Sequence, residues 1–261
     1  MRIEFITQDD PLYILPLFQE FLPLCDGKFE VTQISSCPTM GSRPRTQLMR
    51  ELFALYGPWG MTKLIGKVAS SRILGRLPAS RTSSTFHSMA QLCRTHEIPY
   101  VRIGNPNATS FVEGLSQRKP DLIVSVACPY ILKRTLLSVP PLGCINIHHA
   151  PLPRYKGMMP TFWQMYHGER SVGLTIHYMS EGLDEGPIIL QEQLAVDAGE
   201  ALDHLIRRSK RHAAGALNRV LGQFLAGEVR TSMPVKSEGS YYTFPTLAEI
   251  RDFHRRGLRA I

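Results

Sequence analysis

Apolar positions along the first 150 residues fall into two alternating patterns. Short, nearly continuous runs rich in β-branched and aromatic residues predict strands, and apolar residues that recur every three or four positions predict helices. The predicted strands cover residues 1–6, 29–34, 100–103, 121–126 and 143–148. The predicted helices cover residues 12–24 and 87–96.

This alternation predicts an α/β fold. The run at 121–126, Asp-Leu-Ile-Val-Ser-Val, is apolar on both faces, as is typical of a strand inside a parallel sheet. Strands that alternate with helices form a mostly parallel sheet with helices on both faces. We therefore expect an open, twisted, Rossmann-like sheet whose ligands bind beyond the carboxyl ends of its strands.

The second half of the chain continues differently. Two further strands are predicted at 173–178 and 187–192, on either side of a loop, and a long helix at 201–225. The residues that follow are too few for a second globular domain of ordinary size. We expect a catalytic domain over 1–226 and a short C-terminal extension over 227–261, with no internal repeat.

The stretch from 52 to 96 differs from the rest in charge, because it contains no Asp or Glu. Its apolar residues recur at helical spacing among lysines and arginines, which predicts a basic amphipathic helix inserted near 56–80. Residues 59–77 could contact an anionic membrane surface or a phosphate-rich ligand. The simpler interpretation, which we favour, is a helix that packs its apolar stripe on the domain and leaves its lysines in water.

The composition is that of a globular protein, with 43% hydrophobic and 20% charged residues. The net charge of +8 attracts anionic partners without selecting among them. No long apolar run exists and the first ten residues are charged, so we expect a cytoplasmic protein without a membrane span or secretory signal. The five cysteines include no C-x-x-C pair, which argues against a disulfide framework and a cysteine zinc site.

Candidate chemistry concentrates between residues 145 and 191. Asn146 and His148 lie two apart at the end of a predicted strand, so both side chains point to the same side of the sheet. Polar groups on a buried strand are costly unless they are hydrogen-bonded or used. The basic loop that follows, with Arg154, Tyr155 and Lys156, is suited to an anionic ligand and is equally consistent with an ordinary loop.

A second candidate segment is the loop at 181–187, which carries three carboxylates between glycines. A carboxylate near an imidazole can orient it and stabilise the imidazolium that forms during proton transfer. His177, on the preceding strand, is a further candidate. We expect no metal site, because the histidine spacing matches no zinc pattern. The sequence also has no G-x-S-x-G elbow, no P-loop and no G-x-G-x-x-G after the first strand, which argues against serine nucleophiles, nucleotide hydrolysis and nicotinamide chemistry.

Three motifs in this region together resemble the 10-formyltetrahydrofolate-dependent formyltransferases, which include glycinamide ribonucleotide, methionyl-tRNA and amino-sugar formyltransferases. They are Asn146-Ile147-His148, the loop at 150–157 and Leu183-Asp184-Glu185-Gly186. In that family an Asn-x-His leads into a Ser-Leu-Leu-Pro loop, and a catalytic Asp follows in a Leu-Asp-x-Gly loop. Ala150 and Pro151 stand where Ser-Leu is usual, which leaves the shape of the loop open.

The resemblance implies an activity and a set of site residues. The formyl donor would be 10-formyltetrahydrofolate and the acceptor an amine. Asn146 and His148 would stabilise the oxyanion of the tetrahedral intermediate, and Asp184 would orient His148 and relay protons. The folate-binding positions implied are Tyr130, Leu132, His177, Gly182 and Asp184.

The acceptor is less sharply indicated. The tail is too short for the tRNA-binding domain of methionyl-tRNA formyltransferases, and the runs at 5–11, 159–163 and 241–245 look like those of amino-sugar formyltransferases. We therefore expect a nucleotide-linked amino sugar, whose phosphates Arg154, Tyr155 and Lys156 would contact. The alternatives are methionyl-tRNA, glycinamide ribonucleotide, a hydroxyornithine-type amino acid, or a catalytically silent folate- or sugar-nucleotide-binding homologue. Nucleic acid is not expected as a partner, and a homodimer is left open.

Overall fold

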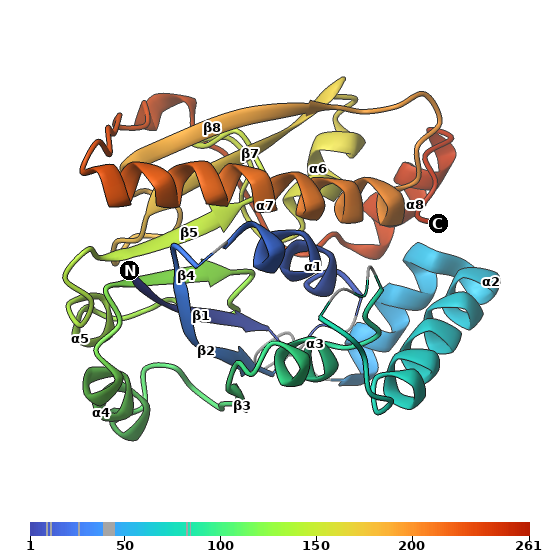
Figure 1. Cartoon of the computed structure of the whole chain (residues 1–261). Coiled ribbons are helices and arrows are strands. Elements are labelled where there is room, and N and C mark those ends of the chain that lie inside the picture. The colour runs from blue at the N-terminus through green and yellow to red at the C-terminus, as the bar shows by residue number, and fades with distance from the viewer. Residues whose placement is uncertain (9, 11, 26, 39–44, 82, 84) are drawn as a thin grey trace.

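A seven-stranded sheet forms the centre of the computed structural model (Figure 1). The structure describes all residues except 9, 11, 26, 39–44, 82 and 84, so part of the run at 5–11 lies outside the described residues. The strand order is β3-β2-β1-β4-β5-β7-β8. The first five of these are parallel: β1 (Arg2–Gln8), β2 (Glu30–Cys37), β3 (Tyr100–Arg102), β4 (Leu122–Val126) and β5 (Cys144–His148).

The other edge of the sheet is antiparallel. Strands β7 (Ser171–Tyr178) and β8 (Ile188–Ala195) follow β5, and each runs opposite to its neighbour. The mostly parallel α/β sheet expected from the apolar pattern is confirmed. Since β5 is the last parallel strand, its carboxyl end borders an antiparallel strand, and this junction carries the candidate site.

Helices cover both faces of the sheet, because alternate residues of the central strands are buried on opposite sides. On one face Phe5 and Val124 pack with α1 (Leu15–Leu24), α3 (Met89–Thr95) and α7 (Leu202–Ala226). On the other face Ile6 and Ile123 pack with α4 (Thr109–Arg118) and α5 (Arg134–Leu137). All residues of β4 are buried, as its continuous apolar run predicts.

A long helix, α2 (Arg45–Leu74), occupies the basic insertion. It is broken at Gly57, whose φ of 64° lies in the left-handed region that glycine adopts without strain. After this break Met61 and Leu64 are buried, whereas Trp59 and Ile73 are exposed. The insertion is therefore helical, buries only part of its apolar residues, and begins earlier than predicted.

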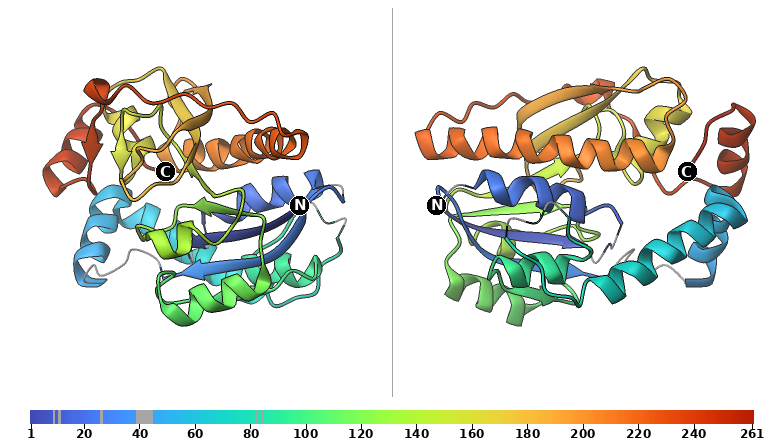
Figure 2. Two further views of the ribbon diagram at one scale, coloured as in Figure 1. Left: turned by 90° about the vertical axis from the view of Figure 1, so that its left-hand side faces the viewer. Right: turned by 45° about the vertical axis from the view of Figure 1, so that its right-hand side comes forward.

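The C-terminal extension packs against the catalytic domain. It comprises η1 (Lys236–Glu238), β9 (Tyr241–Tyr242) and α8 (Leu247–Arg255). Strand β9 pairs in parallel with β6 (Lys156–Gly157), and α8 lies beside α2 and α6 (Pro160–Tyr166) at one end of the molecule (Figure 2). Two segments outside the main sheet, the insertion and the tail, therefore meet on the side of the candidate site.

Candidate active site

The end of β5 places Asn146 beside His177. Because β5 and β7 are antiparallel neighbours, these two residues face each other in register, with 3.2 Å between Asn146 Nδ2 and His177 Nε2. His177 Nδ1 lies 2.8 Å from the carbonyl oxygen of Tyr178, which can only accept. Nδ1 therefore carries the ring hydrogen, and Nε2 accepts from the amide of Asn146. One hydrogen of this amide remains for another acceptor.

Burial lowers the pKa of His177 to about 4, against the opposing effect of the Asp184 carboxylate. The ring is therefore neutral near pH 7, which agrees with its role as an acceptor for Asn146. A neutral imidazole at this position fixes the orientation of the Asn146 amide without adding a positive charge to the site.

Asp184 lies between two histidines. Its Oδ2 is 3.7 Å from His148 Nδ1, and its Oδ1 is 3.7 Å from His177 Nε2. His148 Nε2 donates to the carbonyl oxygen of Tyr155 over 2.9 Å, so Nδ1 is the ring atom that can exchange a proton beside the carboxylate. Distances of this kind are often long in unliganded sites and shorten when a reactant binds.

The loop at 155–159 contacts both His148 and Asp184. Besides the contact from Tyr155, the backbone N–H of Gly157 donates to Asp184 Oδ2 over 3.1 Å. Gly157 has a φ of 95°, and a Cβ at this position would lie 2.2 Å from the carbonyl oxygen of Tyr242. Only glycine fits here, because both the conformation and the close approach of the tail exclude a side chain.

The C-terminal tail fixes this loop by accepting hydrogen bonds from the backbone N–H groups of the loop. Ser240 Oγ accepts from the N–H of Tyr155, and the carbonyl oxygen of Ser240 accepts from the N–H of Lys156, each over 2.9 Å. The carbonyl oxygen of Tyr242 accepts from the N–H of Met158 over 2.9 Å. The tail therefore supports the loop that orients His148 and Asp184.

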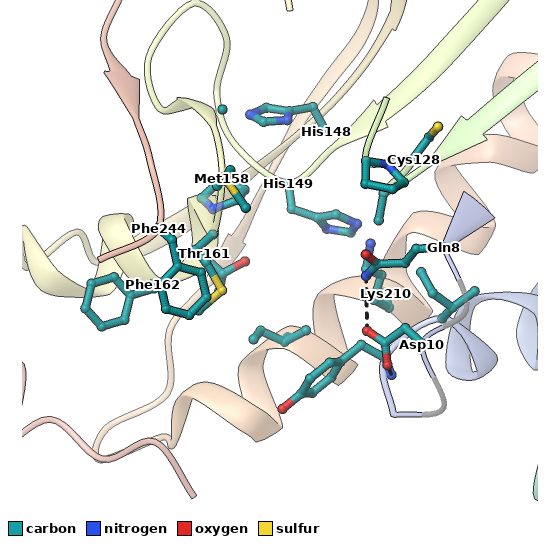
Figure 3. A pocket seen from close by; sticks show the side chains of 18 of the residues that line it. Gln8, Asp10, Cys128, His148, His149, Met158, Thr161, Phe162, Lys210 and Phe244 are labelled. Carbon is teal, nitrogen blue, oxygen red and sulfur yellow. Dashed lines mark hydrogen bonds between the residues drawn. The ribbon is translucent and has the colours of Figure 1, made fainter. Parts of the chain in front are cut away.

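A cavity of about 320 Å³ opens beside His148 (Figure 3). Its walls come from the segment between β1 and α1, from the loop after β4, from the end of β5 and the loop that follows it, from helices α2, α6 and α7, and from the tail. Gln8, Asp10, His149 and Lys210 gather on one side of it, and Met158, Phe162 and Phe244 lie on the other. The basic insertion contributes Leu52 and Tyr56, and thus forms part of the cavity wall as well as of the core.

The predicted catalytic residues and His177 come together, whereas the other three predicted folate contacts lie outside the cavity. Leu132 is buried and Tyr130 is half-buried against the core beneath α4 and α5, and Gly182 is exposed in the loop before Asp184. None of these three lines the cavity described above. Their role in folate binding stays a prediction.

The three predicted acceptor contacts are engaged with acidic side chains. Arg154 pairs with Glu169 over 3.0 Å, and the hydroxyl of Tyr155 donates to the same carboxylate over 2.8 Å. Lys156 pairs with Glu185 over 2.8 Å. Contacts from Arg154, Tyr155 and Lys156 to a phosphate stay a prediction, and such contacts would compete with these pairs.

Sequence reasoning missed the polar wall of the cavity and the support of the site. No sequence pattern singled out His149 or Lys210 for the wall of a cavity. The described residues contain no group of three or more His, Cys, Asp or Glu that could hold a metal ion. One sequence feature that could have indicated how the tail supports the loop is Gly157, the glycine that ends the basic loop.

Comparison with known proteins decides the family. The profile of a family described as formyl transferase matches residues 85–221, just over half of the chain, and this range contains Asn146, His148, His177 and Asp184. The chain belongs to the formyl transferase family.

The curated relatives and the structural neighbours of this chain are formyltransferases of different substrate types. Methionyl-tRNA formyltransferases of Pelobacter propionicus and Syntrophus aciditrophicus are 37% and 39% identical to this formyl transferase, over 53% and 56% of its chain and 44% and 47% of theirs. The chain thus spans about half the length of the curated relatives it matches. A glycinamide ribonucleotide transformylase from Symbiobacterium toebii shares the fold with a TM-score of 0.59 at 19% identity, covering 90% of this chain and 94% of the other. A sugar N-formyltransferase from a Shewanella species has a TM-score of 0.57 at 17% identity, covering 93% and 76%.

Proposed function

We propose that this formyl transferase moves a formyl group from 10-formyltetrahydrofolate to a primary amine. The observation that carries the proposal is the placement of Asp184 between His148 and His177, with Asn146 bonded to His177, at the carboxyl end of β5 and next to a cavity. This arrangement supplies an amide donor, a proton-exchanging imidazole and a carboxylate within one small volume.

These groups match the demands of acyl transfer to nitrogen. Attack of the amine on the formyl carbon forms a C–N bond and leaves an oxyanion, toward which the free amide hydrogen of Asn146 can donate. Nδ1 of His148, beside Asp184, can take the proton that the amine loses. The same proton is returned to the folate nitrogen as its bond to the formyl carbon breaks, so the site ends in its starting protonation state.

For the acceptor, we propose a nucleotide-linked amino sugar. Support comes from the cavity of about 320 Å³, whose size suits a small molecule, and from the tail, which packs back on the catalytic domain. The names of the curated relatives favour methionyl-tRNA instead, so that acceptor belongs in the same experiment.

The test is an assay of tetrahydrofolate release from 10-formyltetrahydrofolate with a panel of amines. The panel contains nucleotide-linked 3-amino and 4-amino sugars, glycinamide ribonucleotide, N-hydroxyornithine and methionyl-tRNA. We expect turnover with an amino sugar. Turnover with methionyl-tRNA alone would overturn the proposed acceptor, and folate binding without any turnover would favour the silent homologue.

Membrane contact through residues 59–77 is the alternative to the packing interpretation that we favour for the insertion. Trp59 is 70% exposed and Ile73 64% exposed, and Lys63 and Arg72 are exposed on the same stretch of α2. Such a face suits an anionic bilayer surface. No helix among the described residues is long and apolar enough to cross a membrane.

The membrane contact is tested by sedimentation with vesicles of neutral lipid and of neutral plus anionic lipid. Membrane contact predicts binding to the anionic vesicles only, and a loss of binding in Trp59→Ser/Ile73→Ser. Equal sedimentation with both lipids, or none, would remove this alternative. Analytical ultracentrifugation decides whether the chain forms the homodimer that the sequence leaves open.

A further inference from the structure

The polar wall of the cavity contains groups that the proposed reaction does not use. Lys210, on α7, is 6% exposed, and His149, directly after β5, is 7% exposed. Asp10 and Gln8 follow from the end of β1, and Figure 3 shows the side chains of these four residues turned toward one another. Buried polar groups of this kind are either structural or reserved for a ligand.

Asp10 belongs to the structural class. One of its carboxylate oxygens accepts from the N–H of Leu12 over 2.7 Å and of Tyr13 over 3.1 Å. The other accepts from Gln8 Nε2 over 3.2 Å. Its carboxylate therefore anchors the loop that enters α1, and it also places a negative charge near Lys210.

Lys210 and His149 keep hydrogen-bonding capacity in reserve. His149 Nδ1 lies 2.8 Å from Ser209 Oγ, but its Nε2 is buried without a hydrogen-bond partner. Within the described parts of the chain, the ammonium of Lys210 makes no hydrogen bond, although it lines the cavity. Leaving such groups unpaired is costly, and a ligand oxygen would remove that cost.

Charge decides which kind of oxygen fits. Lys210 and Asp10 carry opposite charges, so the wall as a whole is close to neutral. A phosphate would add about two negative charges beside a single ammonium. The charge of this ammonium is already balanced by a carboxylate. A hydroxyl adds no charge, accepts from Lys210, and can donate to Gln8 Oε1 or to an unprotonated ring nitrogen.

The opposite wall fits the rest of a sugar ring. Met158, Phe162 and Phe244 offer apolar and aromatic surface there. Pyranose rings present C–H faces to such surfaces while their hydroxyls point to polar groups. An apolar wall facing a neutral polar wall is therefore suited to a hydroxylated ring and poorly suited to a pyrophosphate.

We propose that Lys210 and His149 bind hydroxyl groups of the acceptor, so that its amine-bearing sugar ring lies inside the cavity and its phosphates lie outside. This inference rests on the proposed function, since it takes the cavity beside His148 as the acceptor site. It makes Lys210 and His149 specificity-determining residues that do not take part in the chemistry.

Two substitutions of His149 separate ligand binding from a structural role. Asn places its amide near the position of Nδ1 and can keep the bond to Ser209, whereas Gln places its amide near Nε2. With a dTDP-linked 4-amino sugar as the probe, we expect His149→Asn to raise the acceptor KM about 3- to 10-fold, the effect of one hydrogen bond. His149→Gln should stay near the native KM. The reverse order would show that the bond to Ser209 is what matters, and would overturn the role of His149.

Lys210→Met tests the ammonium. It preserves most of the side-chain volume and removes the charge, so the acceptor KM should rise about 10- to 100-fold with little change in kcat or in the KM of the folate. The matched control is Arg211→Met, at the exposed neighbouring position of α7, which should leave all three constants unchanged. Circular dichroism and the Tm establish that both variants are folded.

The nature of the contact is tested by removing groups from the probe. If Lys210 holds a hydroxyl, a deoxy analogue lacking that hydroxyl should bind the native protein and Lys210→Met equally. If loss of the nucleotide phosphates abolishes the difference instead, Lys210 binds phosphate and the proposal is wrong.

Failure of the activity itself is distinguishable from failure of this inference. Should no amine be formylated, titration calorimetry of the same sugar nucleotide still compares the native protein with Lys210→Met. Weaker binding by the variant would support the inference in a silent homologue. Equal binding, or no binding to the native protein, would overturn it.

Discussion

At the scale of single residues, two backbone carbonyl groups determine which ring nitrogen of each histidine carries the hydrogen, because a carbonyl oxygen can only accept a hydrogen bond. The carbonyl oxygens of Tyr155 and Tyr178 each take a ring hydrogen from a histidine, which leaves His148 Nδ1 and His177 Nε2 facing Asp184. The two histidines thereby acquire different tasks. His148 can exchange a proton beside the carboxylate, and His177 orients Asn146.

The first prediction concerns these catalytic groups. Asn146→Ala should lower kcat about 10²- to 10³-fold by removing an oxyanion donor, and His148→Ala or Asp184→Ala about 10²- to 10⁴-fold by removing proton transfer. Glu181→Gln, an exposed carboxylate of the same loop, is the control and should leave kcat unchanged. Near-native kcat in folded His148→Ala would contradict the mechanism.

The second prediction concerns pH and stability. His177 has a pKa of about 4 in the folded chain because it is buried, against an ordinary value near 6.5. Between these values the unfolded chain binds the proton and the folded chain does not, so the free energy of unfolding falls as the pH drops from about 6.5 to 4. The loss from this one group approaches about 3 kcal/mol.

His177→Gln removes this titration, so its unfolding free energy should depend less steeply on pH within that window. Urea unfolding at several pH values measures the slope, with His254→Gln on the exposed side of α8 as the control. A slope in His177→Gln equal to that of the native protein would show that His177 is not the buried neutral histidine described here.

At the scale of elements, the tail acts as a brace for the site. Strand β9 pairs with β6 directly beside the loop that holds His148 and Asp184, and Tyr242 stacks on Trp163 of α6 with ring centroids 4.6 Å apart. A segment far along the chain therefore sets the geometry of a loop it follows by about 80 residues. The tail belongs to the active site in a structural sense, although it supplies none of the catalytic groups.

The third prediction tests this brace. Gly157→Ala would place a Cβ 2.2 Å from the Tyr242 carbonyl oxygen, so β6 and β9 must separate or the loop must shift. We expect kcat to fall by at least 10-fold, because displaced catalytic groups lose alignment, while Gly227→Ala at the start of the tail, with no close neighbour, should retain it. Native kcat in Gly157→Ala would show that the tail pairing is dispensable.

The elements that could be predicted are those whose own apolar pattern specifies them. Strands β4 and β5 are continuous apolar runs, and α7 has a clear apolar stripe, so each was placed within a few residues. Helix α8 was missed although Thr246 and Glu249 form a capping box, because it is short and polar. The pairing of β6 with β9 involves two residues on each side and leaves no periodic signal to find.

At the scale of the whole molecule, the cavity combines residues from distant parts of the chain. The proposed catalytic residues lie inside residues 85–221, which the family profile covers, and their Asn-x-His and Leu-Asp-x-Gly motifs made their placement together predictable. The cavity also draws on the loop after β1, on α2 and on the tail. These segments meet only through the topology of the sheet, so no local pattern could have shown that Gln8, Lys210 and Phe244 share one pocket.

This division leads to the last prediction, which asks which substrate the cavity holds. Phe244, from the tail, is 4% exposed and forms part of the apolar wall. Phe244→Leu keeps this wall apolar but removes its flat aromatic surface, so the acceptor KM should rise several-fold while the folate KM is unchanged. Met233→Leu, exposed on the same tail and outside the cavity, should change neither constant.

Two arrangements of the active site are separated by which of the two constants rises, the folate KM or the acceptor KM. If the folate KM rises and the acceptor KM stays constant, the cavity holds the folate, and the acceptor must approach His148 from the side of the Asp184 loop. If the acceptor KM rises alone, the cavity holds the acceptor, and the tail takes part in selecting it together with Lys210 and His149 of the family core. That outcome would explain how a chain with methionyl-tRNA formyltransferase relatives can act on a different amine, because part of the wall around the acceptor comes from segments outside the family profile.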